Sequence, residues 1–171
     1  MRIRQFEPAD RAAVVDLWHR AGLVRPWNDP ERDLDRKLAD SPWGMLVGLI
    51  EGDDLLAGVS AAEQGPGVGE VVASAMVGYD GHRGSIFYLA VDAAARGRGY
   101  GSALMAHAES LLWARGCPKL NVSVRADNSQ VIGFYLDRGY RLEGPDHAVS
   151  LGLRLIEDGS PPIPRTRPTA R

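Results

Sequence analysis

The stretch LAVDAAARGRGYGSALM, residues 89–105, constrains the fold more than any other part of the chain. An apolar run typical of a buried strand ends at Asp92, and a glycine-rich stretch with two arginines then leads directly into apolar residues at helical spacing. Backbone N–H groups at the start of a helix lack partners within the helix and carry the positive end of its dipole, and glycine lets a ligand approach them closely. A strand, a glycine turn and a helix in this order therefore predict a site for a phosphate group.

Two other interpretations of the glycines remain open on these residues alone. One is a turn that only lets the chain pass from a strand into a helix. The other is a dinucleotide-binding turn, because GRGYGS at 97–102 approaches the G-x-G-x-x-G pattern. That turn should follow its strand directly, however, and here residues 92–96 intervene. A Walker-type loop is excluded, because no lysine followed by serine or threonine closes the motif.

Length and charge exclude several classes of protein. The 171 residues suit one domain with a hydrophobic core, and a formal net charge of −2 argues against a nucleic-acid partner. Cys117 is the single cysteine, so no internal disulfide can form. The first ten residues contain no apolar signal region, and no apolar run is long enough to cross a bilayer. We expect a cytoplasmic protein without a membrane partner.

The apolar pattern predicts strands and helices that alternate along the chain. Alternating or continuous apolar residues predict strands at 1–6, 44–52, 70–79, 85–91, 119–126, 140–144 and 147–155. Helical spacing of apolar residues predicts helices that start near Pro8, Asp29, Gly101 and Asn128. An Asp-Gly pair at 80–81 predicts a hairpin between two of the strands. This order implies an α/β fold with one mixed sheet and helices on both faces.

Two segments carry little apolar sequence. Residues 53–69 include EQGPGVG, which is typical of a turn or loop and whose role stays open. Residues 159–171 are proline-rich and basic, and we expect disorder there. A single domain over residues 1–158 is therefore predicted.

Several separated blocks resemble the GCN5-related N-acetyltransferase (GNAT) family. RGRGYG at 96–101 matches the family's Arg/Gln-x-x-Gly-x-Gly/Ala signature, and VRADNSQVIGFYLDRGY at 124–140 resembles its second block. RPWNDP at 25–30, GYDGHRG at 78–84 and RGCPK at 115–119 resemble a bacterial subgroup. The resemblance implies a single-domain GNAT fold whose sheet splays between two central strands. It also implies acetyl-CoA as cosubstrate, an amine acceptor, no metal and, as in many relatives, a possible homodimer.

The resemblance also assigns residues to the acetyl-CoA site. It implies that Leu89, Ala90 and Val91 bind the pantetheine arm through their backbone, at a bulge, and that an N–H near Val91 stabilises the oxyanion. The pyrophosphate would be held by Arg96, Gly97, Arg98, Gly99, Tyr100, Gly101 and Ser102. Asn128 would contact the arm, although the sequence alone equally predicts a helix cap at this position.

Tyr135 is the catalytic residue that the resemblance implies, as proton donor to the leaving thiolate. A phenol, with a pKa of about 10, is a workable acid for a thiolate whose conjugate thiol has a pKa of about 8.5. The alternative is an aromatic side chain of the core at helical spacing. In the family's reaction the amine attacks the thioester directly, so Cys117 needs no chemical role.

The general base and the acceptor are the open parts of the prediction. Neither SIFYLAV at 85–91 nor LNVSVRA at 120–126 carries an acid, and the remaining candidates are Glu70, Asp80 and His82, while Tyr88 could instead organise a chain of water molecules. Without a strong base, an α-amine or another weakly basic amine suits the site better than a lysine side chain, because its deprotonation at pH 7 costs less free energy. The acceptor stays open between a polypeptide N-terminus and a small-molecule amine. Residues expected to line the acceptor pocket are Arg25, Trp27, Asp80 and His82. A non-catalytic acyl-CoA-binding or sensing module remains the alternative function.

Overall fold

The computed structural model describes residues 1–50 and 69–142. The chain divides into two compact units, Met1–Val122 and Ser123–Arg171, and each is described by itself. The first unit contains a five-stranded sheet in the order β1-β2-β3-β4-β5. Its elements are β1 (Arg2–Gln5), α1 (Arg11–Arg20), α2 (Pro30–Asp40), β2 (Met45–Ile50), β3 (Glu70–Tyr79), β4 (Gly84–Val91), α3 (Tyr100–Trp113) and β5 (Leu120–Val122). The described part of the second unit contains α4 (Ser129–Asp137).

The sheet is mixed, as expected from the sequence. Strands β1 to β4 pair antiparallel in chain order, and β5 pairs parallel with β4. The predicted hairpin joins β3 to β4, with Tyr79 opposite Gly84. Its turn is closed by the Asp80 carboxylate, which accepts hydrogen bonds from the amides of His82 and Arg83.

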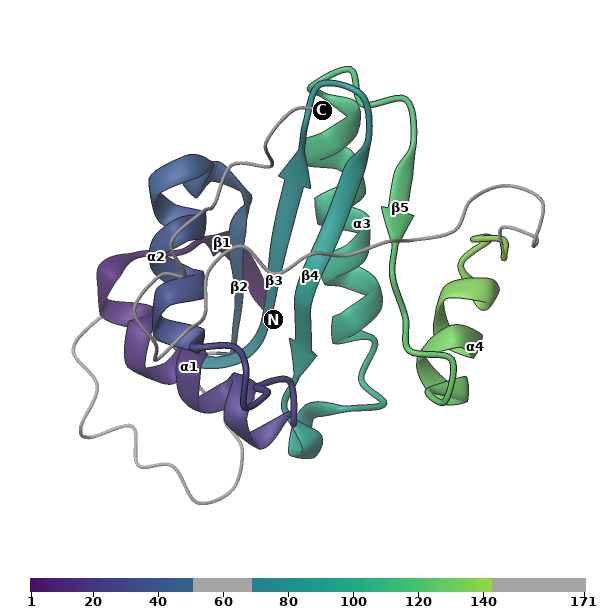
Figure 1. Cartoon of the computed structure of the whole chain (residues 1–171). Helices are drawn as coiled ribbons and strands as arrows, with labels where there is room; N and C mark the ends of the chain where they lie inside the picture. Colours follow the sequence, from purple (N-terminus) through teal and green to yellow (C-terminus); the bar gives the residue numbers. More distant parts are fainter. Residues whose placement is uncertain (51–68, 143–171) are drawn as a thin grey trace, which may run out of the picture. The chain divides into compact units, whose positions relative to one another are not determined.

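Helices cover both faces of the sheet, as predicted (Figure 1). On one face α1 and α2 bury Leu17, Trp18 and Leu34 against the inward side chains of β2 and β3. On the other face α3 buries a stripe consisting of Leu104, Met105, Ala108 and Leu112. A Cβ atom at Gly84 would lie 2.8 Å from a methyl carbon of Leu112, so α3 packs directly on β4. This packing fixes both elements that flank the glycine stretch.

The helix boundaries follow the chemistry that the sequence indicated. The Asp29 carboxylate accepts hydrogen bonds from the amides of Glu31 and Arg32 at the start of α2, with Pro30 in the first turn. The Asn128 side chain accepts from the amide of Val131 and so caps α4. Glycines in the left-handed conformation follow three helices: Gly22, Gly116 and Gly139.

The expected strands near the C-terminus differ from the structure. The predicted strand over 119–126 is a strand only at β5. Residues Tyr140–Leu142 do not form the start of a strand, because the Tyr140 amide donates to the carbonyl of Tyr135 and completes the C-terminal cap of α4. The rest of that strand and the predicted strand over 147–155 lie outside the described residues, as do the tail and nearly all of the 53–69 segment.

A buried ion pair connects β1 to the first helical turn. Asp10 is 3% exposed, and its carboxylate accepts hydrogen bonds from both terminal nitrogens of Arg4, at 2.7 and 2.9 Å, and from the amide of Glu7 at 2.7 Å. The hydrogen bond to Asp10 raises the pKa of the Arg4 guanidinium. The carboxylate therefore satisfies both a cation and a backbone donor.

The substitution Asp10→Ala is expected to lower the free energy of unfolding by about 3 kcal/mol, because it leaves Arg4 and the Glu7 amide without this acceptor. Urea unfolding measures the change. The control is Asp16→Ala, an exposed position of α1, for which we expect less than about 0.5 kcal/mol. Equal stability of the two variants would contradict the assignment.

Candidate functional site

The segment between β4 and α3 starts from a fixed point. Asp92 follows β4 directly, and one of its carboxylate oxygens accepts a hydrogen bond from the amide of Ala94 at 3.0 Å. The other oxygen accepts two hydrogen bonds from Arg20, at 2.9 and 3.1 Å. Arg20 ends α1, so this ion pair ties the end of the helix to the start of the segment. The start of the glycine segment is therefore held in place by the contacts of Asp92.

Two glycines of the segment have a backbone conformation that favours glycine. Gly97 has φ +74° and Gly99 has φ +78°, which an L-residue with a side chain rarely adopts. A Cβ atom at either position would meet no atom within 4 Å. Glycine is therefore required by the conformation and not by lack of space, and the surface in front of the backbone is open.

The backbone amides at the start of α3 are available to a ligand. Across residues 1–50 and 69–142, no protein atom accepts a hydrogen bond from the amides of Gly97 to Ser102, and Ala103 is the first donor, to the carbonyl of Gly99 at 3.0 Å. Gly99 occupies the N-cap position, where it offers no side-chain oxygen. We call the amides of residues 97–102 the amide cradle. Free donors at the positive end of a helix fit an anion, and in particular a diphosphate.

Two arginines accompany the amide cradle. Arg96 and Arg98 are both exposed, and Arg96 donates through Nε to the carbonyl of Val91 at 3.2 Å. This hydrogen bond leads the side chain back along the end of β4. The residues present therefore fit the pyrophosphate of a nucleotide-like cosubstrate, because they combine free amides, an open glycine surface and two cations.

One edge of β4 is unpaired near the cradle. The pairing of β4 with β5 covers only Gly84 to Ile86, so within the described chain the residues 87–91 have no strand partner on that side. Leu89, Ala90 and Val91, which the family resemblance assigned to the pantetheine arm, all lie in this part. The Val91 carbonyl accepts from Arg96 Nε, and the other backbone groups on this edge can accept an extended ligand as an added strand.

The same part of β4 contains the expected bulge. Ser74 pairs with Ala90, whereas Met76 pairs with Phe87, so Tyr88 and Leu89 together lie opposite one residue of β3. Tyr88 has φ +49° and is the non-glycine residue with positive φ in the described part of the chain. The bulge therefore lies at the unpaired edge.

Side chains that the sequence did not connect meet at Tyr88. The ring of Trp18 lies 4.2 Å from that of Tyr88, centroid to centroid, and its Nε1 donates to Ser74 Oγ at 2.9 Å. Ser74 Oγ donates to the carbonyl of Tyr88 at 3.3 Å, and the Tyr88 hydroxyl donates to Asp33 Oδ2 at 2.7 Å. The only signal in the sequence was a serine within the apolar run of β3, because a buried polar group needs a partner.

The candidates of the second unit are described within that unit. Asn128 is an exposed helix cap, and its contact with the cosubstrate stays a prediction. Tyr135 is 7% exposed, and its ring lies edge-on to those of Phe134 and Tyr140, each at 5.2 Å. Burial raises the pKa of Tyr135 to about 12. The phenol is therefore neutral at physiological pH and can act only as a proton donor.

The acceptor candidates lie in two different places. Arg25 and Trp27 lie between α1 and α2, and the Trp27 side chain is 54% exposed. Asp80 and His82 lie in the β3–β4 turn, at the opposite end of β4 from the glycines (Figure 1). Hydrogen bonds from the amides of Arg83 and His82 lower the pKa of Asp80, which makes this carboxylate a weaker base. The structure thus brings neither residue of the turn to the cradle.

Of the base candidates on the sheet, Glu70 lies at the same end as the glycine segment, because Val72, two residues further along β3, accepts a hydrogen bond from the Asp92 amide at 2.8 Å. Glu70 starts β3 opposite Ile50, and Tyr88 lies at the bulge. The described residues contain no group of three or more histidine, cysteine or acidic side chains that could hold a metal ion. They also contain no helix with the length and apolar character needed to cross a membrane.

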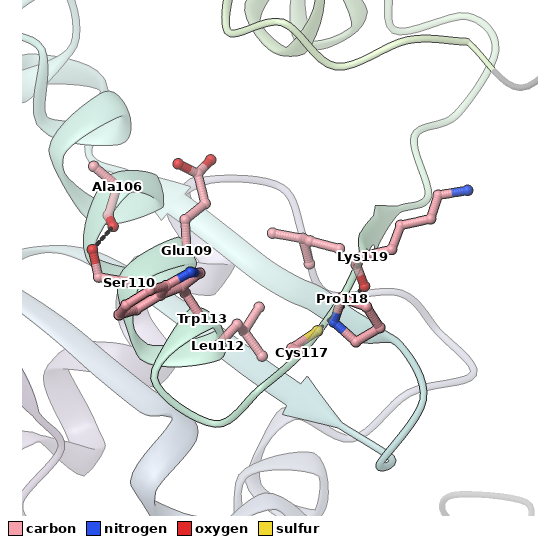
Figure 2. Close-up of a pocket in the computed structure, with 9 residues that line it drawn as sticks. Ala106, Glu109, Ser110, Leu112, Trp113, Cys117, Pro118 and Lys119 are labelled. Atoms are coloured by element: carbon pink, nitrogen blue, oxygen red, sulfur yellow. Dashed lines mark hydrogen bonds between the residues drawn. The ribbon is translucent and has the colours of Figure 1, made fainter.

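An open hollow of about 490 Å³ lies at the far end of α3 from the cradle. Figure 2 shows its lining, which comes from α3 between Ala106 and Trp113 and from residues 117–120. Cys117 lies at its edge and donates through Sγ to the carbonyl of Lys119 at 3.3 Å, a contact that suits the structural role expected for it. None of the predicted site residues lines this hollow.

The sequence and the fold match those of known proteins. The family model described as "Acetyltransferase (GNAT) family" matches residues 12–140. An acetyltransferase of Sodalis glossinidius is 45% identical over 158 residues, which are 92% of this chain and 98% of the relative. An acetyltransferase of Pectobacterium atrosepticum is 46% identical over the same length and shares.

Solved structures share the fold at low sequence identity. The ribosomal-protein-S18-alanine N-acetyltransferase of Escherichia coli aligns with a TM-score of 0.61 and 22% identity, over 81% of this chain and 76% of its own. The structure of the NatC complex bound to Gag peptide and CoA contains a chain that aligns with a TM-score of 0.64 and 14% identity, over 83% and 86%. These likenesses support the fold described above.

Proposed function

The chain belongs to the acetyltransferase (GNAT) family, and on this premise we propose that it moves the acetyl group of acetyl-CoA to a primary amine. The homologues support an acetyltransferase, and the family uses acetyl-CoA. The observation that carries the proposal to this chain is the amide cradle. Its free amides and the two arginines fit the pyrophosphate of coenzyme A.

The proposed mechanism assigns binding and orientation to the first unit. When bound, acetyl-CoA supplies a thioester whose carbonyl carbon is open to attack by an amine. The amide cradle, Arg96 and Arg98 bind the diphosphate, and the backbone of Leu89 to Val91 binds the pantetheine arm along the unpaired edge. An N–H near Val91 stabilises negative charge that develops on the carbonyl oxygen.

Tyr135 is proposed as the group that protonates the leaving thiolate. The family resemblance of its sequence block supports this role, as does a side chain that stays neutral at physiological pH. Asn128 is proposed to contact the arm while it caps α4. A phenol of raised pKa is a weak acid, but it holds its proton until the thiolate forms.

The proposed acceptor is an α-amine, such as a peptide N-terminus. Neither β4 nor β5 carries a carboxylate that could remove a proton from a strongly basic amine. At pH 7 the deprotonation of a lysine-like amine costs about 4.6 kcal/mol, whereas that of an α-amine costs about 1.1 kcal/mol. The two solved structures named above are consistent with a polypeptide acceptor, since one acts on a protein alanine and the other holds a peptide.

At pH 7, a peptide with a free N-terminus and no lysine is expected to react with a kcat/KM at least about 100-fold above that of an N-acetylated peptide with one lysine. Release of the coenzyme A thiol measures both rates, and a peptide blocked at both positions gives the background. A preference for the lysine peptide would contradict the α-amine. Tight binding of acetyl-CoA without thiol release on any amine would contradict the transferase activity.

A further inference from the structure

The bulge of β4 depends on a residue in an unusual conformation. Tyr88 has φ +49°, which is an outlier for a large L-residue outside a glycine position. Such a conformation persists only where the surroundings determine it, and it is often found at functional sites. The contacts of Tyr88 therefore decide whether the strand keeps its bulge.

Three side chains hold Tyr88 from three different elements. Trp18 of α1 stacks on its ring, and Asp33 of α2 accepts a hydrogen bond from its hydroxyl at 2.7 Å. Ser74 of β3 donates to its carbonyl at 3.3 Å, and the serine is itself fixed by the Trp18 indole at 2.9 Å. We call these four residues the Tyr88 clamp. Trp18 and Ser74 are fully buried, so the clamp is built into the core.

The Tyr88 clamp supplies a hydrogen bond in place of one that the bulge removes from the sheet. A bulge interrupts the regular ladder between two strands and leaves a backbone group to be satisfied in another way. Here a serine side chain takes that part, because Ser74 Oγ donates to the Tyr88 carbonyl. Beside the bulge, Tyr88 packs against the core cluster that contains Met76 and Ala90, whereas Phe87 is exposed. The bulge therefore shifts the register of the residues that follow it in β4 against β3.

We propose that the Tyr88 clamp positions the unpaired backbone of Leu89 to Val91 for the acetyl group, with Tyr88 and Asp33 as positioning residues. The inference rests on the proposed function and extends it to side chains that touch neither substrate. It follows from the place of the bulge, which lies where the pairing of β4 with β5 has already ended. Through Asp33 and Trp18, helices α2 and α1 set the orientation of peptide groups on a strand.

The test compares the variants Tyr88→Phe and Asp33→Ala. Tyr88→Phe keeps the ring on Trp18 and removes the hydroxyl that donates to Asp33, and it is expected to lower kcat about 10-fold. The KM for acetyl-CoA is expected to change less than about threefold, because the amide cradle supplies most of the affinity. The double variant is expected to have the kcat of Tyr88→Phe, since both changes break the hydrogen bond between Tyr88 and Asp33, and the ion pair with Arg36 that Asp33→Ala also breaks is exposed.

Two further variants separate positioning from stability. Asp35→Ala breaks a hydrogen-bonded ion pair with Arg11, on the same helix but away from Tyr88, and is expected to keep the wild-type kcat. Asp33→Asn keeps an oxygen that accepts from the Tyr88 hydroxyl, and is expected to restore most of the kcat lost in Asp33→Ala. A purely structural role would lower the melting temperature of Asp33→Ala and Asp35→Ala alike without a specific change in kcat.

Each outcome of this experiment decides one of the two proposals. Wild-type kcat in folded Tyr88→Phe and Asp33→Ala, with an active wild-type protein, would overturn the clamp alone. Independent, multiplicative losses in the double variant would overturn it as well. A wild-type protein that neither binds acetyl-CoA by calorimetry nor acetylates any amine would overturn the proposed function, and the clamp with it.

Discussion

Replacement of Gly99 by tryptophan is expected to weaken the binding of coenzyme A more than about 100-fold, which corresponds to about 2.7 kcal/mol. Gly99 has φ +78° at the N-cap of α3, and a side chain there projects from a backbone whose amides are free for a ligand. The indole would block access of the diphosphate to these amides. Isothermal titration of the folded variant with coenzyme A measures the loss.

The matched control is Gly116→Trp, because Gly116 follows the other end of the same helix with φ +73° and is equally open to solvent. Both variants carry the cost of a left-handed L-residue, about 1–2 kcal/mol of stability. Only Gly99→Trp is expected to lose affinity. Normal affinity in Gly99→Trp would contradict the amide cradle, and titration of the wild-type protein with NAD tests the dinucleotide interpretation of the same glycines.

The parts of the fold that the sequence predicted are those set by local chemistry. Asp29 with Pro30 marks the start of α2, because a cap needs only its own helix. The glycines that follow α1, α3 and α4 were equally predictable, since the left-handed conformation favours glycine wherever it occurs. The strands β2 and β3 were predicted because their apolar residues are buried on both faces.

The parts that the sequence did not predict depend on distant contacts. The strand expected over 119–126 is short because its length depends on pairing with β4, which stops at Ile86. The Tyr88 clamp joins residues that are 14 to 70 positions apart, so no local pattern announces it.

In the candidate site, too, features set by local sequence could be predicted, and features that depend on distant contacts could not. The cradle could be predicted, because a strand, glycines and a helix place free amides at one point whatever the rest of the chain does. The position of a general base could not, because it depends on which side chains several elements bring to one place. A substitution in the amide cradle alone should therefore abolish binding of the coenzyme. The positioning of the β4 backbone, in contrast, depends on residues of α1, α2 and β3 together.

The substitution Tyr135→Phe is expected to lower kcat about 100-fold, because it removes the proposed proton donor, while the KM for acetyl-CoA stays within about twofold. The control is Tyr140→Phe, which removes a hydroxyl from the ring packed edge-on against Tyr135 and is expected to keep the wild-type kcat. Steady-state kinetics on an α-amine peptide measures both. A Tyr135→Phe protein with unchanged kcat would remove this residue from the mechanism.

The pH dependence gives an independent check on the same residue. Burial raises the pKa of Tyr135 to about 12, whereas an unfolded tyrosine titrates near 10. The folded state thus disfavours the phenolate, and the stability linked to the neutral phenol is complete below about pH 10 and lost as the pH rises through about 12. We expect kcat to rise as the acceptor amine loses its proton and to show no fall up to about pH 10.5. A fall in kcat near pH 8 or 9 that is absent in Tyr135→Phe would mean that the proton donor has a pKa in this range. It would therefore contradict a buried phenol with a raised pKa.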